Sequence, residues 1–447
     1  MNQIRRGSAM VAVIWGLTIA AMLVAALQVG TNRMAMLGRD TMEHIRARWA
    51  ARAGAEATIA TLAYHTRYPV QNDAYAMVTD LERVHTGELT GGSWLIQHAS
   101  GDTVTPFAGP LDEHAKLNVN GEQRGYIDMM FAPLAWGVYA AIEDWIDEDD
   151  DPSEFGVERD YYLSLDARYE PRNAPLQSVA ELELVAGIEP NDIRGEDWNL
   201  NAMLDPEEDD GEETLPWDDE SGVLNGGWAR MLTVRSVADG ATASGLPRIW
   251  LLATDADELI ERMDLLNLEF PPEKADAIIS SAVSGEFSAT ELIAALGRET
   301  ASSTDENAEE GETESSEIVY TRDEVAAILS ETSLTPSHRR DWGRININTV
   351  PPETLYAMFE GGERLVDGLL SLRTRRASGL TSPVDFWYLQ DIDEQALTQL
   401  IPMFDTNSNV FAICSRGRSA ATDEVAEINM VVDRSTLPVR ILEYRED

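Results

Sequence analysis

The apolar residues of this chain are concentrated in one long run at its start. No ionisable side chain occurs between Gly7 and Arg33. At about 1.5 Å per residue, a helix over 8–29 would span the ~30 Å hydrocarbon layer of a bilayer. Residues 31–66 continue without proline and are rich in Ala, Met, Leu and Arg. The pattern therefore predicts one helix from Ser8 to about His65, whose first half crosses a membrane once.

Short alternating segments, typical of strands, occur only near the two ends of the remaining chain. Two follow the long helix and three lie at the C-terminus; they are Gly91–Ala99, Leu111–Asn120, Val410–Ser415, Val425–Asp433 and Val439–Arg445. Residues 121–405 lack clear alternation and carry helical patterns instead, at Ala275–Val283, Ala289–Leu296, Asp323–Leu329 and Glu353–Phe359. This arrangement predicts an α+β fold. A long N-terminal helix would pack on a small antiparallel sheet, with a large, mainly helical domain inserted between strands.

The sign of the net charge changes near the end of the predicted long helix. The first 67 residues hold eight arginines and three acids, whereas the whole 447-residue chain has a formal charge of −45. An acidic body of this size repels nucleic acid, so we expect no nucleic-acid partner. A single cysteine, Cys414, excludes an internal disulfide framework.

The apolar run could also belong to a cleavable secretion signal. It is long for such a signal, and no helix-breaking residue ends it before the helical pattern resumes. Arg5 and Arg6 precede it, which predicts a cytoplasmic N-terminus and an acidic body on the other side of the membrane.

The segment RRG-SAMVAVIWGL resembles the leader and first turns of type IV pilin-like proteins. The resemblance implies that prepilin peptidase cuts between Gly7 and Ser8 and methylates the new N-terminus. The fifth mature residue, a glutamate in most of these proteins, is here Ala12. That departure is similar to the minor pseudopilin K family of type II secretion systems. The family implies a non-enzymatic subunit at the tip of a periplasmic pseudopilus, held in the bacterial inner membrane and its lipid, with minor pseudopilins I and J as partners.

Composition and this resemblance together predict five parts of the chain. They are a leader (1–7), a transmembrane and spine helix (8–66), the first part of a pilin-like domain (67–120), the inserted helical domain (121–405) and the closing strands (406–447). Two acidic stretches, 205–220 and 299–317, punctuate the insert.

One acidic segment of the insert has the ligand spacing of an EF-hand calcium loop. Oxygen-bearing side chains occupy loop positions 1, 3, 5, 9 and 12, which are Asp197, Asn199, Asn201, Asp205 and Glu208. The sixth position, usually glycine, is Ala202, so an altered turn or a plain solvated loop remains an alternative.

A second acidic cluster, Asp144–Pro152 followed by Phe155–Glu158, resembles the calcium-binding segment of pseudopilin K. Crowded carboxylates repel one another unless a divalent cation neutralises them. We predict Asp147, Asp149 and Glu158 as calcium ligands, against the alternative of a solvated charged loop.

Three segments form a weak internal repeat: Lys116–Asn120 (KLNVN), Arg248–Leu252 (RIWLL) and Arg344–Asn348 (RININ). We expect the asparagines to hold turns through backbone N–H groups. The third segment also resembles the opening of a helix-hairpin-helix unit, and with Arg373, Arg375 and Arg376 it leaves a membrane-anchored DNA-uptake or DNA-binding protein as the alternative function. Motifs of nucleotide-binding loops, serine hydrolases and zinc proteases are absent, so we expect no enzyme.

Overall fold

The computed structural model describes most of the chain. The residues outside the description are 1–3, 71, 100, 102, 132–136, 238–241, 243, 289, 294–317, 335–341, 390–391, 393 and 447. The predicted acidic stretch 299–317 therefore lies outside the described residues, and so do positions 289 and 294–296 of one predicted helix.

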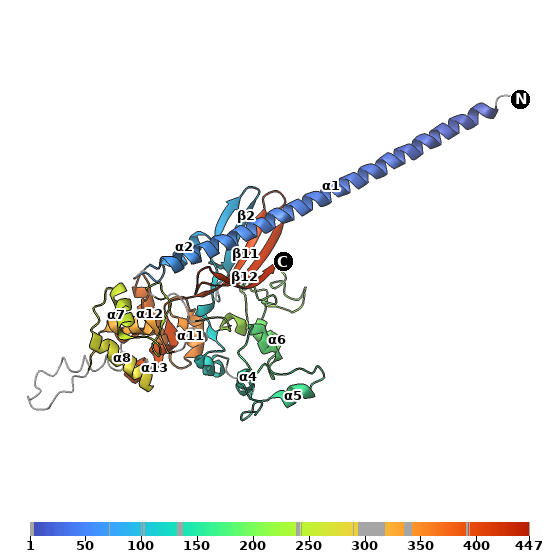
Figure 1. The fold of residues 1–447 in the computed structure, drawn as a ribbon. Helices are drawn as coiled ribbons and strands as arrows, with labels where there is room; N and C mark the ends of the chain where they lie inside the picture. Colours follow the sequence, from blue (N-terminus) through green and yellow to red (C-terminus); the bar gives the residue numbers. More distant parts are fainter. Residues whose placement is uncertain are drawn as a thin grey trace, which may run out of the picture.

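The first helix, α1, runs without interruption over Ile4–Arg67. Its N-terminal half projects far beyond the rest of the molecule (Figure 1), and every residue from Met10 to Met42 is exposed. The helix is long and apolar enough to cross a membrane, and the most apolar stretch has no buried residue. The predicted cleavage position, Gly7–Ser8, lies in the opening turns of α1, where cleavage stays a prediction.

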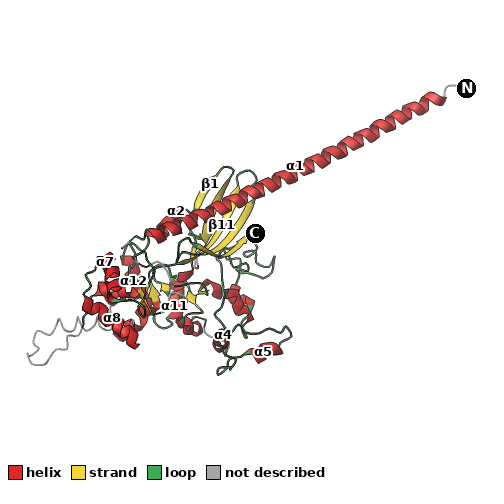
Figure 2. Cartoon of the chain, in the orientation of Figure 1, coloured by secondary structure: helices red, strands yellow, loops and turns green. Residues whose placement is uncertain are grey.

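A five-stranded antiparallel sheet packs against the C-terminal half of α1 (Figure 2). Its order is β1 (Thr86–Leu89), β2 (Gly92–His98), β11 (Val410–Ser419), β12 (Val425–Asp433) and β13 (Arg440–Glu446). Two short strands extend it, β3 (Phe107–Ala108) beside β2 and β4 (Leu111–Asp112) beside β11. A short helix, α2 (Ala76–Arg83), connects α1 to β1.

Small residues let α1 lie directly on the sheet. Ala47, Ala51 and Ala55 are fully buried. A Cβ placed on Gly417 of β11 would lie 1.9 Å from the carbonyl oxygen of Ala47, so the helix backbone touches the strand. The Ser415 hydroxyl donates to the Ala51 carbonyl at 2.7 Å. Only a small-residue face allows this close approach.

Between β4 and β11 the chain forms the mainly helical part, which lies on the far side of the sheet from the free end of α1 (Figure 1). Its described helices are α3 (Ile127–Met130), α4 (Val138–Ile146), α5 (Arg159–Ser164), α6 (Pro190–Arg194), α7 (Ala256–Leu265), α8 (Pro272–Ser284), α10 (Arg322–Glu331), α11 (Pro352–Met358), α12 (Glu363–Arg375) and α13 (Glu394–Leu400). The predicted α+β class, with a helical part inserted between strands, is confirmed.

One strand prediction was wrong, and one strand longer than two residues was missed. Leu111–Asn120 does not form a single strand, because the 3-10 helix Glu113–Ala115 interrupts it. The following β5 (Leu117–Asn118) leaves the main sheet and pairs with β6 (Leu232–Thr233). The missed strand is β1, whose sequence TGEL has too few apolar residues to show alternation.

The internal repeat corresponds to a repeated structural device. Each of its segments contributes one strand to a two-residue parallel ladder: β5 with β6, β7 (Ile249–Trp250) with β8 (Thr332–Ser333), and β9 (Ile345–Asn346) with β10 (Phe404–Asp405). In the first segment the Asn120 amide exchanges two hydrogen bonds with the backbone of Leu176. In the third, Asn348 does the same with Leu380. The asparagines thus hold turns, as predicted.

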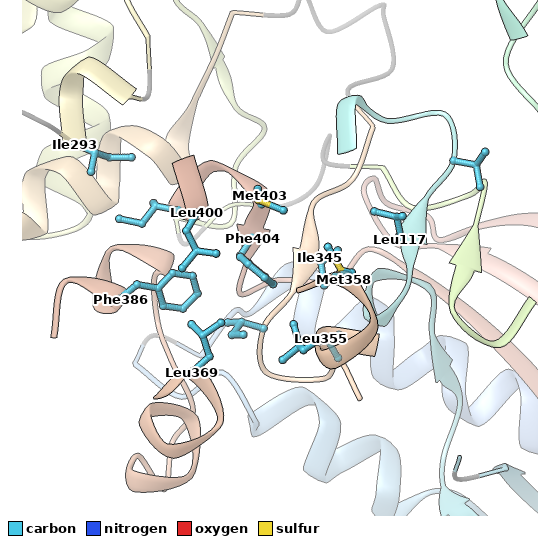
Figure 3. Close-up of a cluster of buried hydrophobic side chains, with 14 of the residues drawn as sticks. Leu117, Ile293, Ile345, Leu355, Met358, Leu369, Phe386, Leu400, Met403 and Phe404 are labelled. Carbon is cyan, nitrogen blue, oxygen red and sulfur yellow. The ribbon is translucent and has the colours of Figure 1, made fainter. Parts of the chain in front are cut away.

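Buried apolar side chains fill two separate cores. The smaller lies between α1 and the sheet, and the larger runs through the helical part. Figure 3 shows part of the larger core, where Phe386, Phe404 and Leu400 converge from different helices and ladders. Ile345 and Leu117 bring two of the repeated ladders into the same core.

Candidate metal centre

Three carboxylates converge where α4 ends and α5 begins. Asp144 lies in the last turn of α4, Asp147 directly follows that helix, and Glu158 directly precedes α5. One oxygen of each lies within 4.8 Å of the other two. Asp144 is fully buried and Glu158 is only 5% exposed. The connection 147–158 therefore folds back so that its two ends present acids to one point.

Backbone geometry in the connection depends on the absence of a side chain at Gly156. A Cβ there would lie 1.9 Å from Oδ2 of Asp144 and 2.6 Å from Oγ of Ser153. The Ser153 N–H donates to both Asp144 oxygens at 3.2 Å. Glycine thus lets the chain close tightly over the Asp144 carboxylate.

Negative charge in this group is not compensated by the described protein. Oδ1 of Asp147 and both carboxylate oxygens of Glu158 are buried without a well-formed hydrogen bond. Burial, together with the charges of Asp144 and Asp147, raises the pKa of Glu158 to about 7. Burial, reinforced by Asp149, raises the pKa of Asp147. Arg159, the neighbouring base, pairs with Glu170 instead.

The donor set suits a hard divalent cation. All the converging atoms are carboxylate oxygens, which calcium and magnesium prefer, and zinc is usually bound through nitrogen or sulfur. Buried acids without hydrogen-bond donors are costly unless a cation replaces the lost water. The orphaned oxygens of Asp147 and Glu158 therefore fit a bound calcium ion.

The sequence-predicted ligands of this cluster differ from the converging group at one position. Asp147 and Glu158 are both in it, but the Asp149 side chain points elsewhere and accepts from the Asp151 N–H at 2.9 Å. Asp144 takes its place. The spacing of 144 and 147 could have indicated this, since residues three apart share one helix face.

The EF-hand-like segment 197–208 folds into a closed loop beside the sheet. Oδ1 and Oδ2 of Asp197 accept from the N–H groups of Asn201 and Ala202, both at 3.0 Å. Glu208 accepts from the N–H groups of Trp198 and Asp205, at 2.9 and 3.1 Å. The carboxylates at the two ends of the loop therefore already have donors.

The middle of the loop is tied to its own amides and to a strand. The side-chain amides of Asn199 and Asn201 donate to Oδ2 of Asp205, at 2.8 and 3.0 Å. Oδ1 of Asp205 pairs with Arg416 of β11. Arg416 also pairs with Glu427 of β12 at 2.7 Å. Arg416 therefore forms an ion pair with Asp205, the residue that the EF-hand spacing predicts as a calcium ligand.

The turn at Ala202 has the backbone conformation of an EF-hand loop, although alanine replaces the usual glycine. Its φ is +58°, in the left-handed region that glycine usually supplies at the sixth position of such loops. Burial raises the pKa of Asp197 to about 6 and that of Glu208 to about 7, because both lie away from solvent. The loop therefore has the predicted kind of turn, but among the described residues the oxygens of Asp197, Asp205 and Glu208 do not converge as those of the first group do, and they are largely occupied by donors.

Two of the three arginines that motivated the DNA-binding alternative have internal contacts, and the third, Arg375, is exposed. Arg373 is half-buried and donates to the carbonyl oxygens of Ile347 and Val350, at 3.1 and 2.8 Å. Burial also lowers its pKa. Arg376 pairs with the buried Asp385 at 2.7 Å. These two bases hold the helical part together and are not presented to a phosphate backbone.

Comparison with known proteins points to one family. A family model described as "Type II secretion system (T2SS), protein K" matches residues 130–195, the segment that contains Asp144, Asp147 and Glu158. The type II secretion system protein K of Klebsiella pneumoniae is 28% identical over 208 residues, which cover 42% of this chain and 60% of that protein.

A solved structure also aligns along most of the chain. It is the GspK-GspI-GspJ complex of the type 2 secretion system from enterotoxigenic Escherichia coli, with a TM-score of 0.46 and 14% identity over 92% of this chain and 99% of the matched one. The family model and the Klebsiella relative confirm the resemblance inferred from the sequence: this chain is similar to protein K of type II secretion systems.

Proposed function

We propose that the chain is a minor pseudopilin of a type II secretion system. The observation that carries the proposal is the division of α1 into two halves. Residues 10–42 are exposed and 10–32 carry no ionisable side chain, whereas from Ala47 onward one face of the helix is covered by its own sheet. A rod that leaves so much apolar surface uncovered needs lipid or other rods around it. Such a helix can reside in a membrane before assembly and then pack against the equivalent helices of partner subunits.

Processing and placement in the cell belong to the same proposal. Prepilin peptidase would cut between Gly7 and Ser8 and methylate Ser8. The bulk of the chain would lie in the periplasm, and the apolar half of α1 in the inner membrane. The helical part adds a large mass beside the sheet and away from the free half of α1 (Figure 1). This mass supports a position at the tip of the pseudopilus, where no subunit has to stack above it.

Calcium binding by Asp144, Asp147 and Glu158 forms the second element of the proposal. The ion would neutralise three adjacent acids and pin the end of α4 to the start of α5. In the loop 197–208, calcium would have to compete with Arg416 for Asp205. We therefore propose the first group as the tighter site and the loop as a weaker one.

The spine contact can be tested by cysteine cross-linking in the full chain. The native Cys414 is buried, so we expect it to form no disulfide with a partner subunit and to add no cross-linked product of its own. Leu37, which is 67% exposed on α1, is replaced by cysteine, and Val283, 68% exposed on α8, serves as the matched control. We expect oxidation to join Leu37→Cys to cysteine-substituted spines of the I-type or J-type pseudopilin, and Val283→Cys to stay unlinked. Equal behaviour of the two positions would overturn the proposal.

The tip position can be tested at Ala12. A carboxylate there would have no amine of a subunit above it and would cost roughly 3 kcal/mol in the membrane. We expect Ala12→Glu to reduce secretion more than the uncharged Ala12→Gln does. The tip position is refuted if Ala12→Glu places the protein along the pseudopilus shaft and leaves secretion unchanged.

A further inference from the structure

Two large apolar side chains project from the acidic loop that follows the candidate metal loop. Leu215 is 80% exposed and Trp217 is 69% exposed. Among the large apolar side chains that the structure describes, none is more exposed than Leu215. Exposed tryptophan and leucine side chains at one point of a surface are typical of contact sites for other molecules.

The loop that carries them has a fixed shape. The Asp218 carboxylate accepts from the N–H groups of Asp210, Gly211 and Glu220, at 3.0, 2.9 and 2.8 Å. The Asp218 N–H returns a bond to the Gly211 carbonyl at 3.1 Å. These bonds close the base of the loop and leave residues 212–217 as its tip.

A second set of bonds orders the tip itself. The Thr214 N–H donates to Oδ1 of Asp210 at 3.1 Å, and the Thr214 hydroxyl donates to the Glu207 carbonyl at 3.0 Å. Leu215 and Trp217 are therefore presented on a preformed support. Little conformational entropy remains to be lost when such a tip binds.

Charge around the tip selects the kind of partner. Residues 205–220 contain ten carboxylates and no base. Three of the exposed acids, Glu212, Glu213 and Asp219, lie within four residues of the apolar pair. A second copy of this chain, with a net charge of −45, would be repelled, and so would anionic lipid head groups.

We propose that the Leu215–Trp217 tip docks into an apolar pocket of a different protein whose rim carries lysine or arginine. The apolar side chains would fill the pocket and the flanking acids would pair with the rim. This contact goes beyond the proposed packing of α1, because the loop belongs to the helical insert and shares no residue with the spine.

The test places a photoreactive benzoylphenylalanine at position 217 of the full chain, in cells with their secretion system. An aromatic cross-linker keeps the character of Trp217. We expect adducts with another protein, joined at a site surrounded by lysine and arginine. Raising the salt of isolated membranes from about 0.1 M to about 1 M shortens the screening length from ~10 to ~3 Å and should reduce the yield. Leu215→Ala should lower it about tenfold, as for a central contact residue.

The same cross-linker at Val283, an equally exposed apolar position with one exposed acid, Glu286, within four residues instead of several, is the matched control. Adducts only with lipid or with a second copy of the chain overturn the inference. The inference is also overturned if the cross-linking yield at position 217 equals that at position 283. It is overturned too if the yield at position 217 changes neither with salt nor with Leu215→Ala. A third cross-linker at Leu37 reports spine packing separately, so failure of the proposed function is distinguishable from failure of this contact.

Discussion

The two acidic groups of the helical insert use similar residues in opposite ways. In the group of Asp144, Asp147 and Glu158, three buried oxygens have no well-formed hydrogen bond. In the loop 197–208, backbone N–H groups, side-chain amides and Arg416 satisfy the acids. The first group leaves three buried carboxylate oxygens without a partner among the described residues, and this is why we propose a cation there. The second is a turn whose charge the protein itself has compensated.

Under the proposed calcium binding, this difference makes ligand spacing alone a poor guide to metal affinity. The loop 197–208 matches the EF-hand spacing better, yet an ion entering it must displace existing donors. The group at α4 and α5 matches no regular spacing, but three of its oxygens, on Asp147 and Glu158, are buried without a hydrogen-bond partner in the described part of the chain. Metal affinity depends on the hydrogen bonds and ion pairs that the acids give up as well as on the metal–oxygen bonds that they form.

The largest expected effect is the stability that calcium gives through Glu158. With free calcium at 100 times its dissociation constant, binding should stabilise the fold by about 2.7 kcal/mol, since only the folded chain assembles the site. Glu158→Gln should abolish this gain and should stabilise the metal-free protein, because it removes an uncompensated buried charge. Thermal unfolding of the full chain in detergent, with calcium or with a chelator, measures both.

The matched control for Glu158→Gln is Asp149→Asn, a carboxylate outside the converging group. It should keep most of the calcium response. If both variants lose the response equally, the converging group is not the site and the comparison between the two clusters fails.

A smaller loss is expected for Arg416→Ala in the second cluster. The change leaves Asp205 and Glu427 without their arginine, which should cost about 2 kcal/mol in the absence of calcium. It should also raise the calcium affinity of the loop, because Oδ1 of Asp205 loses its arginine partner. Calorimetric titration of calcium into the variant and the parent chain checks this. An unchanged weak-site affinity would mean that the loop is a structural turn and no ligand cage.

Gly156→Ala should cost about 1.5 kcal/mol, because the added methyl group would overlap the Asp144 carboxylate. It should weaken the first calcium site and leave the loop 197–208 unaffected. Gly125→Ala is the control, since its new Cβ would lie 3.8 Å from the Tyr139 hydroxyl, an ordinary contact. Terbium luminescence sensitised by tryptophan measures site occupancy. Equal losses in both variants would contradict the tight closure at Gly156.

The smallest expected effect is a pH dependence of the metal-free protein. Burial and neighbouring acids raise the pKa of Glu158 from 4.5 to about 7, so the folded chain holds a proton that the unfolded chain releases between these values. Metal-free stability should therefore fall as pH rises from about 4.5 to 7. Calcium should oppose this fall because it binds the ionised form. The melting temperature of the parent chain and of Glu158→Gln across this range tests the sign, and a parent curve as flat as the variant's would contradict it.

Sequence patterns predicted the parts of this molecule that depend on long repeated signals. The uninterrupted α1 follows from a long apolar run without a helix breaker, and the strands β11 and β12 follow from apolar positions that the sheet and helix bury. Leu111–Asn120 was misjudged because tertiary pairing overrides local alternation: Leu117–Asn118 pairs with Leu232–Thr233, more than 100 residues away. A ladder of two residues leaves no periodic signal in the sequence.

The candidate site was predictable in composition but not in detail. Crowded acids around Trp145 indicated a cation, and both Asp147 and Glu158 belong to the converging group. Exchanging Asp149 for Asp144 required knowing where α4 ends. The pairing of Asp205 with Arg416 joins residues 211 positions apart, so no local pattern could indicate it.

The sheet beneath α1 has a consequence for how the chain is made. Its central strand, β11, starts at residue 410, and the Arg434 guanidinium reaches the Thr66 hydroxyl across 368 positions. The rod emerges from the ribosome first and is soon followed by β1 and β2, but β11 and β12 are synthesised only after the helical insert. The part of the α1 face that β11 and β12 cover must therefore stay uncovered or be chaperoned until then. Residues 410–433 thus complete the packing on α1, and a chain that stops before residue 410 leaves part of the small-residue face of α1 exposed.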